Sequence, residues 1–253
     1  MDDFQQQRAA TKARVRRRGI YLLPNLFTTA ALFAGFYSIV QAMNQRFEDA
    51  AVAIFIAMVL DGLDGRVARL TKTQSAFGAE YDSLSDMVSF GAAPALVMYE
   101  WALRPMDKLG WVAAFVYVAG AALRLARFNT NLDVVDKRFF QGLPSPAAAA
   151  LVAGFVWVSQ AFALTTVAER WVGLVITLYA GLTMVSNVPF YSFKTINLKR
   201  SIPFVVLLLV VLGFSLLLIH PPSVLFICFV VYGLSGYVYG GWQWLRRRRK
   251  RPA

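Results

Sequence analysis

Acidic side chains lie in the interior of two stretches that are otherwise apolar, residues 49–70 and 79–101. Asp61 and Asp64 are three residues apart in the first stretch, and Asp82 and Asp86 are four apart in the second. At 3.6 residues per turn, each pair falls on one face of a helix. Because a short loop joins the two stretches, they are expected to be antiparallel neighbours. The spacing therefore predicts two pairs of carboxylates that face each other across one helix interface.

Carboxylates gathered in this way repel one another and require cations. Arg66 and Arg69 follow closely in the sequence and are one source of positive charge. Divalent metal ions are the better source, because oxygen ligands suit Mg²⁺ or Mn²⁺ and the chain has only one His and one Cys to bind a softer metal. Acids within membrane segments usually mark function. The pattern predicts a site for divalent metal ions.

The elements that hold these acids belong to a series of apolar runs. Of the 253 residues, 58% are hydrophobic and only 16% are charged, which argues against a soluble globular domain or a disordered chain. A spanning helix needs about 20 apolar residues. Eight runs approach this length, and they predict an all-α polytopic membrane protein with spans at 24–42, 49–70, 79–101, 108–129, 145–165, 170–187, 202–220 and 222–244.

The basic residues predict the orientation of these spans. If the N-terminus is cytoplasmic, all but four of the 26 Lys and Arg residues fall at cytoplasmic ends, the exceptions being Arg46, Arg104, Lys108 and Arg170. Cytoplasmic loops of membrane proteins carry this excess of positive charge. The distribution predicts that both termini are cytoplasmic. It also accounts for the net charge of +12 without nucleic acid, since the basic ends would contact anionic lipid headgroups.

The N-terminal segment is basic and precedes an apolar run, as in a signal peptide. The run is long for a signal peptide, and seven further runs follow it. We therefore interpret residues 24–42 as the first span and residues 1–20 as a basic segment at the membrane surface.

The acids and their neighbours resemble the signature of the CDP-alcohol phosphotransferases. Each fixed position of that pattern is occupied, at Asp61, Asp64, Gly65, Ala68, Arg69, Gly78, Asp82 and Asp86. The resemblance implies that an alcohol displaces CMP from a CDP-linked lipid. It also implies a homodimer and a six-helix domain, here residues 21–200, with a metal site on the cytoplasmic side. Residues 201–253 would then be two additional helices with a basic tail.

Flanking stretches resemble the integral-membrane bacterial members of the family that use serine as the acceptor alcohol. These stretches are Glu80–Gly91, Arg124–Asn129 and Gly142–Pro146. The resemblance implies that CDP-diacylglycerol and L-serine are the substrates, and that the enzyme lies in the inner membrane with its active site facing the cytoplasm.

The same resemblance implies a role for each site residue. Asp61, Asp64 and Asp82 would bind metal, while Asp86 would be both a ligand and the general base. Arg69 would bind the pyrophosphate, since the guanidinium group matches phosphate oxygens. The other expected contacts to CDP-diacylglycerol are Asn25, Thr28, Gly65 and Ser75.

Arg124 and Arg127 lie three residues apart near the cytoplasmic end of their predicted span. They share one helix face, and we expect them to hold the serine carboxylate. An equally simple interpretation is that they anchor this helix end at the membrane surface.

Two alternatives remain open from the sequence. The first is the same chemistry with another acceptor, such as glycerol 3-phosphate, an inositol compound or choline. The second is an ion or proton transporter in which intramembrane acids form a relay. A relay predicts acids distributed across the bilayer, whereas the acids inside these spans cluster on two helices near one side.

Overall fold

A computed structural model describes residues 24–71, 73–130, 139–163, 167–192 and 204–249. Each of the eight predicted runs is helical within these residues. The N-terminal helix, Pro24–Met43, is followed by seven more helical segments. Six of them are α2 (Phe47–Thr71), α5 (Lys108–Thr130), α6 (Ser145–Ala161), α7 (Val167–Val185), α8 (Phe204–Ile219) and α9 (Pro221–Arg249).

The remaining run, the third, is not a uniform α-helix. It begins as α3 (Ala76–Asp86) and continues through η1 (Met87–Ala92), α4 (Ala93–Met98) and η2 (Tyr99–Leu103), and the two η segments are π-helical. A short 3₁₀ turn, η3 (Arg104–Met106), ends the run. Such π-helical turns are rare and often lie at functional sites. The first of them begins directly after Asp86.

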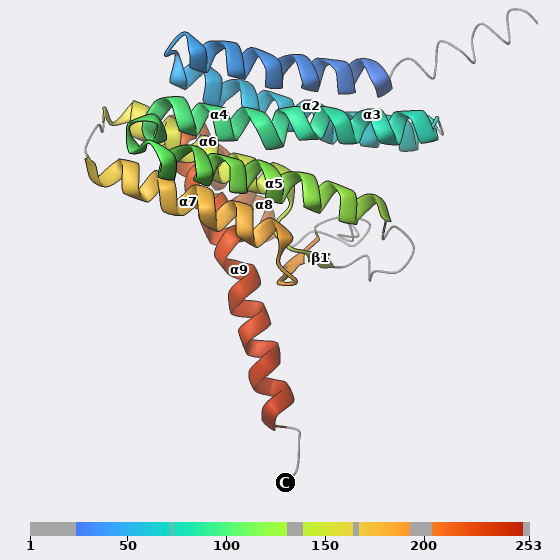
Figure 1. Ribbon diagram of the computed structural model, residues 1–253. Helices are drawn as coiled ribbons and strands as arrows, with labels where there is room; N and C mark the ends of the chain where they lie inside the picture. The colour runs from blue at the N-terminus through green and yellow to red at the C-terminus, as the bar shows by residue number, and fades with distance from the viewer. Residues whose placement is uncertain (1–23, 72, 131–138, 164–166, 193–203, 250–253) are drawn as a thin grey trace, which may run out of the picture.

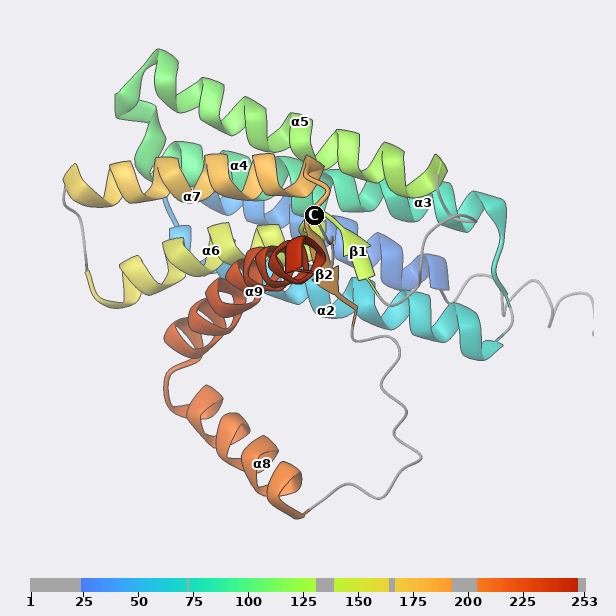
Figure 2. The ribbon, with the colours of Figure 1, turned by 90° about the horizontal axis from the view of Figure 1, so that it is seen from below.

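Six of the helical segments form a bundle. The N-terminal helix, α2, the α3–η2 segment, α5, α6 and α7 run side by side in both views (Figures 1 and 2). Small residues allow close contact, as where Gly120 of α5 lies against Gly181 of α7, a position at which an added Cβ would collide with backbone. Helices in membranes commonly pack through such small residues, because lipid is as apolar as their side chains.

The centre of the bundle is α6, which buries most of its residues, including the four alanines 147–150. A short antiparallel ribbon lies beside it, formed by β1 (Phe139–Gln141) and β2 (Pro189–Tyr191), with Phe140 opposite Phe190. The prediction of purely helical structure missed this ribbon. Strands of three residues are too short to show the alternation of polar and apolar residues by which a strand is recognised.

The last two helices are arranged differently from the bundle. No residue of α8 is buried, and Figure 2 shows α8 standing away from the other helices. The first half of α9 packs on α6, and its C-terminal half projects away from the bundle at a steep angle (Figure 1).

Within the described residues, four helices are long and apolar enough to cross a membrane: Pro24–Met43, Lys108–Thr130, Val167–Val185 and Pro221–Trp242. Two shorter apolar helices, α6 and α8, add to them. The chain is therefore a polytopic membrane protein. The two acid-bearing segments fall outside this criterion, so the predicted count of eight crossings stays a prediction.

Candidate functional site

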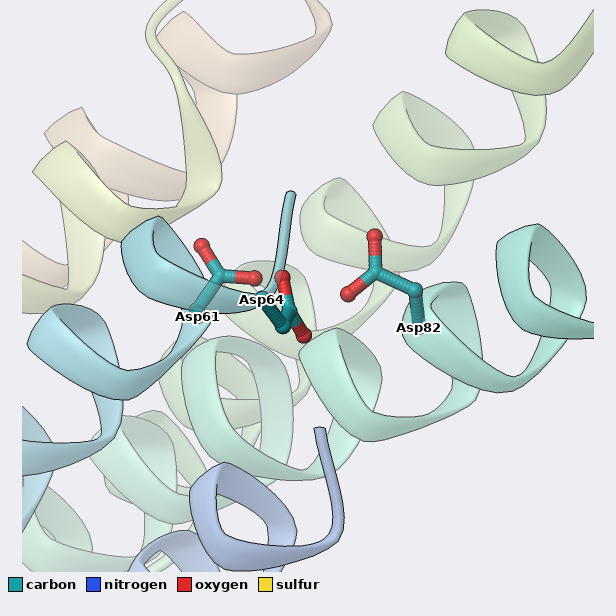
Figure 3. Close-up of side chains that lie close together, drawn as sticks. All are labelled: Asp61, Asp64 and Asp82. Atoms are coloured by element: carbon teal, nitrogen blue, oxygen red, sulfur yellow. The ribbon is translucent and has the colours of Figure 1, made fainter. Parts of the chain in front are cut away.

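Three carboxylates converge between α2 and α3. Asp61 and Asp64 project from α2 and Asp82 from α3, and one oxygen of each lies within 4.8 Å of those of the other two. Figure 3 shows the three side chains directed toward a common point. Three of the four acids that the spacing predicted to face one another thus come together at this helix interface. Three carboxylates at this separation are a typical oxygen ligand set for a hard divalent cation.

The surroundings of these carboxylates also suit a cation. Asp64 is only 5% exposed, and its Oδ2 lies 2.7 Å from the hydroxyl of Thr28. Asp82 Oδ1 is buried and has no hydrogen-bond partner in the described part of the chain. A buried carboxylate oxygen without a partner is costly. A bound metal ion would satisfy it, so the residues present fit a metal centre.

A cavity of about 340 Å³ opens beside the carboxylates. Asp64 and Asp82 form part of its wall. The wall also contains all five residues expected to contact CDP-diacylglycerol, which are Asn25, Thr28, Gly65, Arg69 and Ser75. The structure therefore brings together residues from the N-terminal helix, from α2 and from the start of α3. Their position beside the acids is what a nucleotide site next to a metal requires.

Local interactions fix several of these side chains. Ser75 caps α3, because its hydroxyl accepts a hydrogen bond from the Gly78 amide at 3.0 Å. Arg69 Nε donates to the carbonyl oxygen of Gly65 at 2.8 Å, which folds the guanidinium back along α2. A Cβ added to Gly65 would meet nothing within 4 Å. This glycine therefore leaves part of the cavity open that a side chain would fill.

Asp86 does not belong to the group of three converging acids. It lies one helical turn beyond Asp82, where α3 passes into the first π-helical segment. It interacts electrostatically with Asp61, Asp82 and Arg124. Asp86 thus interacts with two of the three converging acids and with a guanidinium.

The two arginines of α5 contact other elements. Arg124 Nη1 donates to the hydroxyl of Ser145 at 2.9 Å, and Arg127 Nη1 donates to Asn187 Oδ1 at 3.2 Å. Neither arginine lines the 340 Å³ cavity. Arg124 interacts electrostatically with Asp86, which is also absent from the wall of that cavity.

Some polar residues of the site were not predicted from the sequence. Thr73 and Gln74 line the cavity, and Ser145 and Asn187 contact the arginines. Only Ser145 gave a signal, as part of the stretch Gly142–Pro146. The others lie in connecting segments, whose side-chain directions follow from tertiary structure and not from periodicity.

Comparison with known proteins agrees with this geometry. A family model described as CDP-alcohol phosphatidyltransferase matches residues 21–185. A CDP-diacylglycerol–serine O-phosphatidyltransferase of Helicobacter pylori (strain J99) is 37% identical over 227 residues, which cover 87% of this chain and 92% of that protein.

Relatives from other organisms carry the same name. The protein of Methanocaldococcus jannaschii is 33% identical over 187 residues, covering 74% of this chain and 83% of its own. That of Mycobacterium tuberculosis (strain H37Rv) is 31% identical over 223 residues, covering 85% of this chain and 78% of its own.

Proposed function

The chain belongs to the CDP-alcohol phosphatidyltransferase family, and from that premise we propose that it transfers the phosphatidyl group of CDP-diacylglycerol to L-serine. The products are phosphatidylserine and CMP. The observation that carries the proposal is the convergence of Asp61, Asp64 and Asp82 beside a cavity lined by the five expected nucleotide contacts. The relatives named above are called serine transferases, which supports serine as the acceptor.

Asp61, Asp64 and Asp82 would hold the divalent metal, with Asp86 as a further ligand. Mg²⁺ or Mn²⁺ suits this all-oxygen set, and two ions are expected. When bound, the metal would neutralise the negative charge that develops on the phosphoryl oxygens and on the leaving phosphate. The unpartnered Asp82 Oδ1 supports the assignment.

The protein groups would act on either side of the reacting phosphorus. The serine hydroxyl oxygen forms a bond to the phosphorus of the phosphatidyl group. The bond from that phosphorus to the bridging pyrophosphate oxygen breaks, and CMP leaves with the electron pair. Asp86 would take the hydroxyl proton as general base. Arg69, which lines the cavity, would pair with the pyrophosphate oxygens once its guanidinium turns from the Gly65 carbonyl.

The serine would bind on the arginine side of Asp86. Arg124 and Arg127 are the cations available to its carboxylate there. A phosphorylated acceptor such as glycerol 3-phosphate would require a denser basic cluster, and choline carries no carboxylate for the arginines to bind. The proximity of Arg124 to Asp86 therefore favours a small carboxylate-bearing alcohol.

We further infer the setting of the enzyme in the membrane. Eight crossings with both termini in the cytoplasm, in the inner membrane, agree with the distribution of basic residues. Residues 21–200 would form the catalytic domain, with residues 201–253 added to it and the active site open to the cytoplasm. A homodimer is the expected assembly. A transport function is less well supported, because three acids converge on one point, with two of them in the wall of one cavity, instead of forming a relay.

One assay tests the proposal. Purified protein in detergent is given CDP-diacylglycerol and one candidate alcohol at a time, and CMP release is measured with EDTA or with added Mg²⁺ or Mn²⁺. We expect CMP only when serine and a divalent metal are both present. CMP release with another alcohol but not serine would overturn the acceptor assignment. Full activity in EDTA would overturn the metal site.

A further inference from the structure

Helix α9 lies beyond the region that the family model matches, residues 21–185. It packs against α6 and β2, which lie next to the hydrogen-bond partners of the two arginines. We propose that α9, acting through the β1–β2 ribbon and the side chain of Tyr232, positions Arg124 and Arg127 for the acceptor alcohol. Tyr232 is thus a positioning residue, supplied by a part of the chain outside the catalytic domain. The inference rests on the proposed function, in which these arginines bind the acceptor carboxylate.

The ribbon determines where the partners of both arginines lie. Ser145, the partner of Arg124, begins α6 three residues after Gly142, which adopts a left-handed conformation with φ +78°. The Gly142 amide donates to the carbonyl of Val188 at 2.9 Å, and the Leu143 amide to that of Thr183 at 3.1 Å. These bonds tie the turn before Ser145 to the last turn of α7 and to the segment between α7 and β2.

The partner of Arg127 lies on that same segment. Asn187 stands two residues before β2, beside Ser186 and Val188, which are linked by a hydrogen bond of 3.3 Å from the Val188 amide to the Ser186 hydroxyl. A displacement of the ribbon would therefore move Ser145 and Asn187 together. Both arginines depend on one small structural unit for their orientation.

Helix α9 covers this unit with a face of small and aromatic residues. The rings of Tyr232 and Phe190 lie 5.7 Å apart, and Gly236 lies so close to Phe190 that an added Cβ would collide with the ring. The Tyr179 hydroxyl of α7 donates to the carbonyl of Gly233 at 2.8 Å. This hydrogen bond links α7 to α9. The contact of Gly236 with Phe190 is close because glycine has no side chain, and it places β2 against α9.

Tyr232 connects α9 directly to the site. Its hydroxyl donates to the carbonyl of Tyr191 in β2 at 3.1 Å, and its phenol interacts electrostatically with Arg124. The Nε of Arg124 is buried without a hydrogen-bond partner in the described structure. An arginine held at one nitrogen by Ser145 and flanked by Tyr232 keeps other donors available for a carboxylate.

A passive role for α9 makes a different prediction. If α9 only contacts lipid, or only stabilises the fold, its alteration would lower the yield of folded protein or affect both substrates equally. If α9 positions the arginines, its alteration would raise the KM for the acceptor alone, because neither arginine lines the nucleotide cavity. The two substrates therefore provide an internal comparison.

The experiment compares two variants with a matched control. Tyr232→Phe removes one oxygen, and Gly236→Leu pushes α9 away from Phe190. Gly241→Leu, on the same helix, is the control, because a Cβ there would meet nothing within 4 Å. For each protein, kcat and the KM values for serine and for CDP-diacylglycerol are measured by CMP release, with the melting temperature in detergent as a test of folding.

We expect Tyr232→Phe and Gly236→Leu to raise the KM for serine by about tenfold, the effect of one misplaced hydrogen bond to a charged group. The KM for CDP-diacylglycerol should stay within twofold, and Gly241→Leu should match the wild type. An unchanged serine KM in Tyr232→Phe, or equal rises for both substrates, would overturn the inference. If Gly236→Leu does not fold, the serine KM of Tyr232→Phe alone tests the inference. If wild-type protein uses another alcohol, the proposed acceptor is wrong, and the same comparison with that alcohol tests α9 separately.

Discussion

Gly65 and Gly62 are both glycines of α2 with open space at the Cβ position, but only Gly65 lines the cavity. Replacing either with leucine should not disturb packing, and each change should favour the helix, since glycine is a poor helix former. The leucine at position 65 would occupy the space where the nucleotide is expected. The two positions therefore separate an effect on binding from an effect on folding.

We predict that Gly65→Leu lowers kcat/KM for CDP-diacylglycerol by about a hundredfold or more, as misplacement of a bound substrate does. Gly62→Leu should retain activity, and both variants should melt at or above the wild-type temperature. CMP release and thermal unfolding in detergent measure the two effects. Wild-type activity in Gly65→Leu would show that the nucleotide lies elsewhere.

Asp86 and Asp61 are expected to differ in role although both are acids of the same interface. We predict that Asp86→Asn lowers turnover by about 10²–10⁴-fold, the usual effect of losing a general base, while CDP-diacylglycerol still binds. Asp61→Asn should weaken metal and nucleotide binding together, because Asp61 lies in the group of three converging carboxylates. Binding is measured separately from turnover, at several metal concentrations. Near-normal turnover of Asp86→Asn at saturating metal and serine would show that Asp86 is not the general base.

The N-terminal helix contributes a threonine that contacts one of the converging carboxylates. Its Thr28 hydroxyl lies 2.7 Å from Asp64 Oδ2, and the neighbouring Thr29 hydroxyl lies 2.9 Å from the Tyr81 hydroxyl at an exposed position. Sequence resemblance assigned Thr28 to the nucleotide. In the structure this threonine also contacts a carboxylate of the candidate metal site. Outer contacts of this kind influence metal affinity.

We predict that Thr28→Val raises the Mg²⁺ or Mn²⁺ concentration needed for half-maximal activity by about tenfold, since such outer contacts commonly contribute 10–100-fold. Thr29→Val makes the same chemical change one residue away and should leave the metal requirement unaltered. Metal titrations of CMP release, begun from chelated protein, provide the measurement. Identical titration curves for Thr28→Val and wild type would contradict the assignment.

The positions of the helices could be predicted from the sequence because each apolar run approaches the length of a membrane-spanning helix. The interface on which the acids converge followed as well, since the spacing of Asp61 and Asp64 fixes their common face. What the sequence did not predict depends on contacts between distant segments. The π-helical turn after Asp86 is one example, where the Phe90 carbonyl accepts a hydrogen bond from the buried Tyr117 hydroxyl at 2.9 Å. The pairing of β1 with β2 is another, because nothing local in either strand specifies its partner.

At the scale of the whole molecule, charge and shape bear on orientation in the membrane. The carboxylate site lies toward the end of the bundle where α2 ends and α3 begins, and α5 and α7 also end there (Figures 1 and 2). The predicted cytoplasmic ends carry most of the basic residues, whereas Arg46, Arg104, Lys108 and Arg170 lie at the other end of the helices. The orientation of the protein in the membrane therefore determines the side from which its substrates enter.

We predict that the end of the bundle holding the site faces the cytoplasm. The test replaces the single cysteine, Cys228, with serine, and then introduces one cysteine at a time at Asn44 or at Thr130, which are exposed residues at opposite ends of the bundle. In intact cells, a maleimide that cannot cross the membrane should label Asn44→Cys, and it should label Thr130→Cys only after the membrane is permeabilised. This outcome is expected because positively charged loops are retained in the cytoplasm, and Thr130 closes the helix that carries Arg124 and Arg127. Labelling of Thr130→Cys in intact cells would place the active site on the outer side of the membrane. That position would contradict the orientation predicted from the basic residues, and it would separate the enzyme from serine in the cytoplasm.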